Sequence, residues 1–487
     1  MARPRIFWIL ILTGVSLIGI LAAPAPGQTL GLGEEEPPSV GGAMTGAILP
    51  IAILLGLLAL YGTAYMPGAL FAAYLLVPFY KGALQAYSPV DLTSLLALLN
   101  AIQVVPLLLA RRRQRISLVG IGLWIGMALL VLGGVLYAPD YSLALSHAVS
   151  YWALVLLPIL PAAWRVGSDP RQVRAFLWTF LIMGVLTVVL GLLSVSGAER
   201  LVVLNMNTIQ VSRAALLVPI VGVAFALRSL GSIGRLAMAG LIPAALLVAL
   251  ASGSRGPLFA FVLMAVFAGV RYLARPHAFN WRRTGGIAGL ALASVVVVSL
   301  AAPELPLISI GRFTRLGDFV QGNLAADSGA SKGDTSAQGR LKLYGQAVMM
   351  FGDQPLLGAG TSGFQAFSLR LLGEKEADRH PHNALLQVAA EFGMVGLAVF
   401  VSLLGIALMR RLPGGSAGPW AGAVRIVFIF FLLNAMLSGN IFSDRMTLGL
   451  LALLLLIDAP GPAAAAPEPL DTPLRVDERQ SAPSKAS

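Results

Sequence analysis

Long apolar runs separated by short polar breaks extend along most of the chain. About 20 apolar residues in a helix cross the ~30 Å hydrocarbon core of a membrane, and most of the runs approach that length. They lie near 6–25, 44–66, 67–80, 90–110, 116–138, 142–163, 175–196, 211–228, 235–251, 256–274, 286–302, 384–409, 420–437 and 444–458. The pattern predicts an all-α, polytopic membrane protein with about 12–14 transmembrane helices.

Composition agrees with this pattern. Only 11% of the 487 residues are charged and 57% are hydrophobic, with a mean hydropathy of +0.82, whereas soluble domains are about 25% charged. A nucleic-acid-binding protein, a disordered chain and a secreted disulfide scaffold are therefore excluded. The chain has no cysteine, which excludes disulfides, thiolate metal sites and cysteine nucleophiles.

The net charge of +12 is concentrated in short loops between the apolar runs. If the N-terminus is cytoplasmic and fourteen spans alternate, every strong basic cluster falls on the cytoplasmic side, as the positive-inside rule requires. These clusters are Arg3 and Arg5, 111–115, 165–174, Arg228 and Arg235, 271–283, and Arg410 and Arg411. The first run also resembles a cleavable signal peptide, but we favour a retained helix.

Five regions follow from the pattern: an N-terminal helix and short loop (1–43), a transmembrane bundle (44–302), an extracytoplasmic loop domain (303–383), C-terminal transmembrane helices (384–458) and a disordered cytoplasmic tail (459–487). The loop domain contains eight basic and eight acidic residues, so orientation does not explain its charges. Its stretch from Arg340 to Phe351 has a helical period, Asp353-Gln354-Pro355 ends that helix, and Gly358-Ala359-Gly360 forms a turn.

Two arginines stand out because each begins a span on the side that the positive-inside rule disfavours. Arg213 and Arg255 are predicted near helix N-termini, where the helix dipole already favours anions. Such arginines often only extend to the membrane interface. Together, however, they suggest a pocket for a diphosphate.

His380 and His382 end the long loop where the next helix starts, and Asn383 follows as the predicted N-cap. Glu391 lies two turns further along. This pair is a candidate site for a metal or for acid–base chemistry, but the chain lacks the further ligands that a metal requires. His147, inside a span, and His277, in a basic loop, are interpreted as packed or solvated residues.

Several of these residues form ordered motifs. His382-Asn383, nine further residues and Gly393-Met-Val-Gly396 resemble the H-[NSQ]-x9-G-x-x-G signature of bacterial O-antigen ligases. Arg213-Ala-Ala-Leu-Leu217 is similar to their R-x3-L motif, and Ser252-Gly-Ser-Arg255-Gly-Pro257 to their next arginine-bearing turn. Arg340 through Gly360 resembles the stretch before the catalytic histidine of the wider ligase and polymerase superfamily. The resemblance covers roughly residues 90 to 455.

The resemblance implies an inverting glycosyltransferase of the membrane-embedded GT-C type, with no cofactor and no metal. It implies transfer of a glycan from undecaprenyl diphosphate to lipid A–core oligosaccharide at the periplasmic face of the bacterial inner membrane. His382 would be the catalytic base, and Arg213, Arg255 and Arg340 would bind the donor. His380, Asn383 and Glu391 would orient groups or contact the acceptor.

Other activities remain open from the sequence. An O-antigen polymerase or a protein O-oligosaccharyltransferase of the same superfamily would differ only in the acceptor. A transporter or flippase of polyprenyl-linked glycans would also need intramembrane arginines, but the chain shows no internal repeat typical of transporters. The sugar, the glycan length and the oligomeric state are not encoded in any motif.

Overall fold

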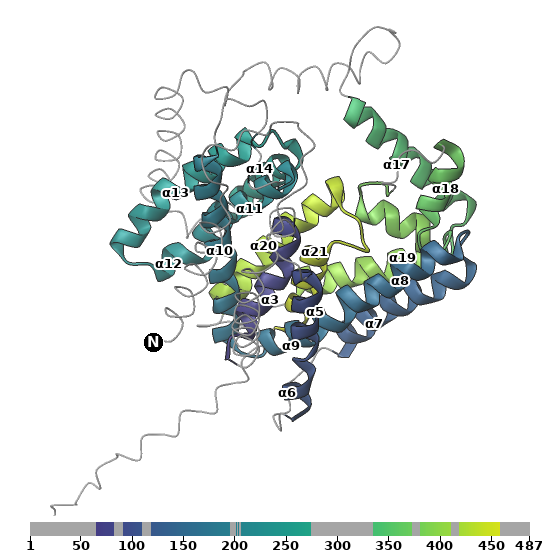
Figure 1. The fold of residues 1–487 in the computed structure, drawn as a ribbon, viewed down its shortest axis with the longest axis horizontal. Helices are drawn as coiled ribbons and strands as arrows, with labels where there is room; N and C mark the ends of the chain where they lie inside the picture. The colour runs from purple at the N-terminus through teal and green to yellow at the C-terminus, as the bar shows by residue number, and fades with distance from the viewer. Residues whose placement is uncertain are drawn as a thin grey trace, which may run out of the picture.

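The computed structural model describes residues 65–81, 91–109, 118–194, 201, 203, 206–273, 335–372, 380–410 and 418–457, and these residues form helices and turns without a strand (Figure 1). Within this part of the chain, seven helices are long and apolar enough to span a membrane. The prediction of an all-α, polytopic membrane protein is confirmed. The predicted runs 6–25 and 286–302, most of 44–66, the segment 303–334 and the tail 459–487 lie outside the described residues.

The span-length helices coincide with predicted apolar runs. They are α7 (Leu118–Gly133) with the 3₁₀ turn η2 (Gly134–Tyr137); α8 (Tyr141–Tyr151), continuing through the π-helical η3 (Trp152–Leu156) into α9 (Leu157–Gly167); α10 (Pro170–Leu193); α11 (Thr208–Val221), continuing through η4 (Gly222–Ala226) into α12 (Leu227–Ser229); α13 (Ser232–Ala251); α19 (Ala384–Met409); and α20 (Gly418–Ser438).

The remaining helices are of two kinds. Apolar ones of shorter length are α3 (Pro67–Leu76) with η1 (Val77–Tyr80), α5 (Leu92–Ala101), α6 (Val104–Leu109), α14 (Arg255–Leu273) and α21 (Arg445–Leu456). Two more helices come from the predicted loop domain: α17 (Thr335–Asp353) and α18 (Gly363–Leu372). The predicted helix over 340–351 and its end at Asp353 are confirmed by α17.

Short polar side chains fix where many of these helices begin. Asp140 accepts a hydrogen bond from the backbone N–H of Leu143 at 3.0 Å and so caps α8. This N–H and the Ser142 hydroxyl hold the pKa of the exposed Asp140 carboxyl below its usual range. Asp91, Asp169, Asn207, Asn383 and Asp444 cap α5, α10, α11, α19 and α21 in the same way. Such caps satisfy amide groups that the first turn leaves unpaired.

Glycines allow the helices of the bundle to approach closely. A side chain at Gly68 of α3 would collide with the backbone of Gln172 on α10, and one at Gly184 of α10 would press against α11. Small residues at helix interfaces are the usual means of packing in membranes, where apolar burial does not favour association. Phe71 and Phe176 fill the adjoining space with ring centroids 5.6 Å apart.

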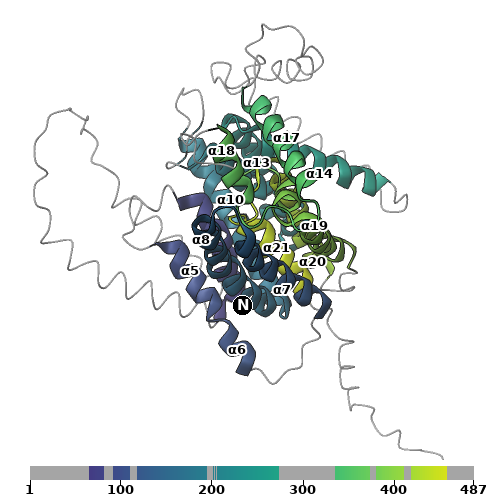
Figure 2. The same ribbon diagram turned by 90° about the vertical axis from the view of Figure 1, so that its right-hand side faces the viewer.

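The bundle has a basic end and an opposite end that we call the site end. At the basic end Arg174 lies over the Trp420 ring, and Arg410 donates to the carbonyl of Leu455. The site end carries the start of α8, α11, α14, α19 and α21 and the end of α7 and α20. Figures 1 and 2 show α7, α8 and α19 running together, with α17 and α18 packed against α19 near the site end. Arg174 and Arg410, from two of the basic clusters, therefore lie at the basic end.

Candidate functional site at one end of the bundle

The start of α19 fixes the two candidate histidines. The Oδ1 atom of Asn383 accepts from the backbone N–H groups of Leu385 at 3.0 Å and Leu386 at 3.1 Å, so the predicted N-cap is confirmed. His382 lies directly before this cap with a φ of 52°, a conformation uncommon outside glycine. The rings of His380 and His382 have centroids 4.3 Å apart. Both residues are partly exposed at the site end, where a ligand can reach them.

Helix α19 is broken at Gly393, inside its apolar span. Gly393 has a φ of 59° and a ψ of −156°, and a side chain there would collide with the backbone of Leu356. The turn formed by residues 355–362 fills the break: Ala359 N–H donates to Ala390 O at 3.0 Å and Gly360 N–H to Glu391 O at 2.9 Å. In return, Met394 N–H donates to Pro355 O at 2.7 Å. The two glycine motifs of the sequence, at 358–360 and 393–396, are thus partners in space.

Glu391 lies beside this break, buried with 1% of its surface exposed. Its Oε1 accepts a long hydrogen bond from Gln387 Nε2 at 3.4 Å. The backbone N–H groups of Ser362 and Phe364, at the start of α18, also interact with the carboxylate. Within the described residues, its Oε2 has no hydrogen-bond partner of ordinary geometry. A buried carboxyl at membrane depth is costly and marks a functional position by default.

Gln387 connects α19 to the loop of residues 439–444. Its Nε2 donates to Asn440 Oδ1 at 3.3 Å, and its Oε1 accepts from the backbone N–H of Ile441 at 3.0 Å. Asn440 Oδ1 also accepts from Phe442 N–H at 3.0 Å. The 439–444 loop is therefore held against the part of α19 that follows the candidate histidines.

Arg213 reaches the other side of the same loop region. Its Nε donates to Asn434 Oδ1 at 3.2 Å and an Nη to Ser438 Oγ at 2.5 Å, both on α20. The guanidinium also interacts electrostatically with Asp444, the cap of α21. The sequence placed Arg213 at a helix N-terminus, but α11 begins at Thr208 because Asn207 caps it there, so Arg213 lies in the second turn.

The other two predicted arginines occupy separate helices. Arg255 is the first residue of α14 and is exposed at the site end, and α14 packs against α11. Arg340 is partly buried in α17, which packs against α19. The structure thus places Arg255 beside the helix of Arg213, and Arg340 beside the helix that follows His382.

Several site residues were missed by sequence reasoning. His147 of α8 contacts the Ser362 hydroxyl through Nδ1 and stacks on Phe442 at a centroid distance of 5.4 Å. Ser362 is buried and has a φ of 59°. These contacts join positions more than 200 residues apart, so no local pattern could reveal them. The sequence could have indicated three other site residues, because they are polar residues in an otherwise apolar C-terminal region; these are Asn434, Asn440 and Asp444.

No group of three or more His, Cys, Asp or Glu side chains able to hold a metal occurs within the described residues. Metal independence remains a prediction, based on the charge that the arginines supply.

Residues 239–401 match a family model described as O-antigen ligase. The match includes Arg255, Arg340, His382 and Glu391, whereas Arg213 lies outside it. The comparison with curated proteins gave no match. Residues 239–401 are therefore similar to the O-antigen ligase family, which confirms the resemblance to the O-antigen ligase superfamily.

Proposed function

We propose that this protein transfers a glycan from undecaprenyl diphosphate to lipid A–core oligosaccharide at the periplasmic face of the bacterial inner membrane. One observation carries the proposal. A short polar path connects Arg213 to the helix that begins after His382: Arg213 bonds Ser438, the next loop carries Asn440, and Asn440 bonds Gln387 of α19. A cation and a candidate base therefore share one end of the bundle, and the base lies within residues 239–401, which match the O-antigen ligase family model.

The arginines would stabilise the leaving group. Breaking the bond between the anomeric carbon and the diphosphate leaves negative charge on the departing phosphate. A guanidinium stays protonated and donates two parallel hydrogen bonds to phosphate oxygens. Arg213 and Arg255 would hold the diphosphate, and Arg340 would add a contact from α17. This positive charge would serve in place of a divalent metal.

His382 would act as the general base. The acceptor hydroxyl loses its proton as it attacks the anomeric carbon, and an imidazole with an ordinary pKa near ~6.5 accepts that proton near neutral pH. Direct attack by the acceptor inverts the anomeric configuration. His380, with its ring against His382, would orient it, while Asn383 fixes the backbone from which both project.

The test uses purified full-length protein, an undecaprenyl-diphosphate-linked glycan and lipid A–core. We expect His382→Ala to bind donor normally, to keep its melting temperature, and to transfer glycan about 10² to 10⁴-fold more slowly. Arg213→Lys and Arg255→Lys keep the charge but lose the planar fork, so we expect weaker donor binding. Arg235→Lys, at the basic end, is the matched control and should change neither quantity.

Transfer by His382→Ala at the wild-type rate would remove His382 from the mechanism. A lower melting temperature with a parallel loss of binding and transfer would instead assign it a structural role. Transfer onto a second lipid-linked glycan, rather than onto lipid A–core, would indicate a polymerase, and transfer to serine or threonine a protein O-oligosaccharyltransferase. Glycan movement across sealed vesicles without covalent product would indicate a transporter.

A further inference from the structure

The turn of residues 355–362 contacts three helices well inside their spans. Thr361 Oγ1 donates to Val131 O at 2.5 Å, six residues before the end of the α7–η2 span at Tyr137. Ser362 contacts His147, six residues after α8 begins, and Gly360 N–H binds Glu391 O, seven residues into α19. At 1.5 Å per residue these depths are about 9–10 Å. Three helices therefore give residues 360–362 a similar depth, while Pro355 and Leu356 bond further along α19, to Met394 and Val395, and Leu357 bonds Tyr137 at the end of the α7–η2 span.

The α7–η2 span has 20 residues, or about 30 Å, which equals the thickness of the hydrocarbon core. The end of this span consequently lies near the boundary of the core, and the turn lies inside it. Irregular backbone is tolerated in hydrocarbon only when its polar groups are paired within the protein. Several groups of the turn meet this condition: the N–H groups of Ala359, Gly360 and Thr361 and the carbonyls of Pro355, Leu356 and Leu357 bond to the α7–η2 span or to α19.

The side chains of the turn divide by polarity. The small and polar residues are buried against the helices; these are Gly358, Gly360, Thr361 and Ser362. The two leucines are exposed, Leu356 by 69% and Leu357 by 53%. The two leucines join a contiguous apolar surface, because Tyr137 donates to Leu357 O at 2.9 Å and Val395 N–H to Leu356 O at 3.2 Å. This surface, which we call the leucine patch, comprises Leu136, Tyr137, Leu356, Leu357, Met394 and Val395.

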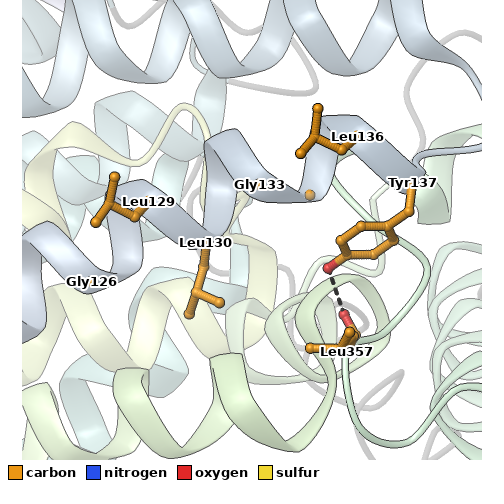
Figure 3. A pocket seen from close by; sticks show the side chains of 8 residues that line it. Gly126, Leu129, Leu130, Gly133, Leu136, Tyr137 and Leu357 are labelled. Atoms are coloured by element: carbon orange, nitrogen blue, oxygen red, sulfur yellow. Dashed lines mark hydrogen bonds between the residues drawn. The ribbon is translucent and has the colours of Figure 1, made fainter.

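The leucine patch continues into a shallow groove of about 400 Å³ along α7. The groove is lined by Leu129, Leu130, Leu136 and Tyr137 of the α7–η2 span together with Leu357, and Figure 3 shows the hydrogen bond between the Tyr137 hydroxyl and the Leu357 carbonyl. Gly126 and Gly133 open the groove, since no atom lies within 4 Å of where their Cβ atoms would be. Its lining is almost entirely hydrocarbon, which suits an extended alkyl chain and offers nothing to bind a polar ligand.

We propose that residues 355–362 form a re-entrant turn inserted into one leaflet of the membrane, and that the leucine patch and the α7 groove contact the acyl chains of bilayer lipids. On this proposal, part of the predicted loop domain (303–383) lies within the membrane. The inference needs no substrate and is independent of the transfer reaction.

The experiment uses single-cysteine variants of the full chain, which has no cysteine of its own. Leu357→Cys and Leu136→Cys probe the patch, and Asp353→Cys, exposed at the end of α17 just before the turn, is the matched control. Each is labelled with bimane and reconstituted into phosphatidylcholine vesicles, with or without bromine atoms on the acyl chains. Iodide serves as the water-soluble quencher.

We expect brominated lipid to quench bimane at 357 and 136 and to leave 353 largely unaffected, while iodide shows the reverse order. Equal iodide quenching at 357 and 353, without lipid quenching at 357, would place the turn in water and overturn the proposal. Resistance of position 357 to both quenchers would show that protein covers the patch, and this result would also overturn it.

Discussion

At the residue scale, Arg213 combines a half-buried positive charge with neutral hydrogen-bond partners. Its bonds to Asn434 and Ser438 satisfy N–H groups without neutralising the guanidinium, and Asp444 supplies a negative field nearby. An uncompensated charge away from water is expensive, so Asp444 stabilises Arg213 when no anion is bound. A diphosphate arriving at Arg213 must then compete with that carboxylate.

We therefore predict that Asp444→Asn binds the diphosphate-linked donor more tightly, by about tenfold or about 1.4 kcal/mol. Asparagine is as good an N-cap as aspartate, so the bond from Thr447 N–H that starts α21 should persist. Equilibrium binding of donor to the detergent-solubilised protein measures the effect. Asp169→Asn, which alters the cap of α10 near the basic end, should leave affinity unchanged. Weaker binding by Asp444→Asn would show that Asp444 orients Arg213 for its ligand.

The arginine charges also lead to a prediction on metals. Glycan transfer should persist in EDTA, because guanidinium groups provide the positive charge at the departing phosphate. Transfer rates measured before and after chelation test this. Activity that falls on chelation and returns with Mg²⁺ or Mn²⁺ would implicate carboxylates such as Asp353 or Asp318, the latter outside the described residues.

At the element scale, α19 and the 355–362 turn complete one another. The break at Gly393 leaves backbone groups of α19 without their normal intrahelical partners, and the turn supplies them. Gly358 and Gly360, with φ of 68° and 83°, permit the backbone contact that makes this exchange possible. The first glycine of the G-x-x-G part of the signature, Gly393, is thus explained by the geometry of the break.

We expect Gly393→Ala to destabilise the protein by about 1–3 kcal/mol or more, because alanine is strained at positive φ and its Cβ meets the backbone of Leu356. Gly405→Ala in the same helix is the control: it has open space around its Cβ and should change stability by less than about 1 kcal/mol. Thermal unfolding in detergent distinguishes the two. Equal melting temperatures would mean that α19 can close into a continuous helix without cost.

At the scale of the whole molecule, the basic end should face the cytoplasm and the site end the periplasm. Single cysteines at Lys342 of α17 and at Ser232, both exposed, test this in intact cells. A membrane-impermeant maleimide that crosses only the outer membrane should label position 342 and should reach 232 only after the inner membrane is permeabilised. The opposite order of labelling would invert the topology.

Sequence periodicity predicted the apolar helices well because a span must be about 20 residues long and uniformly apolar. It also located the α17 helix, the turn at 358–360 and the cap at Asn383, each of which depends on local residues. It could not show that α19 is broken, since hydropathy is the same on both sides of Gly393. Nor could it pair His147 with Ser362 or Arg213 with Asn434, because those contacts depend on how distant helices pack.

The exchange of hydrogen bonds at the break also determines where the polypeptide can be divided. Hydropathy suggests that residues 303–383 could be excised as an independent water-soluble unit. Removing them would leave the Ala390 and Glu391 carbonyls and the Met394 and Val395 amides without the partners that the structure gives them, at several kcal/mol for each group in hydrocarbon. The excised fragment would in turn lose the scaffold that holds residues 355–362 in shape. Residues 355–362 and α19 therefore depend on each other for their backbone hydrogen bonds, and the undivided chain is the suitable one for measuring what either part does.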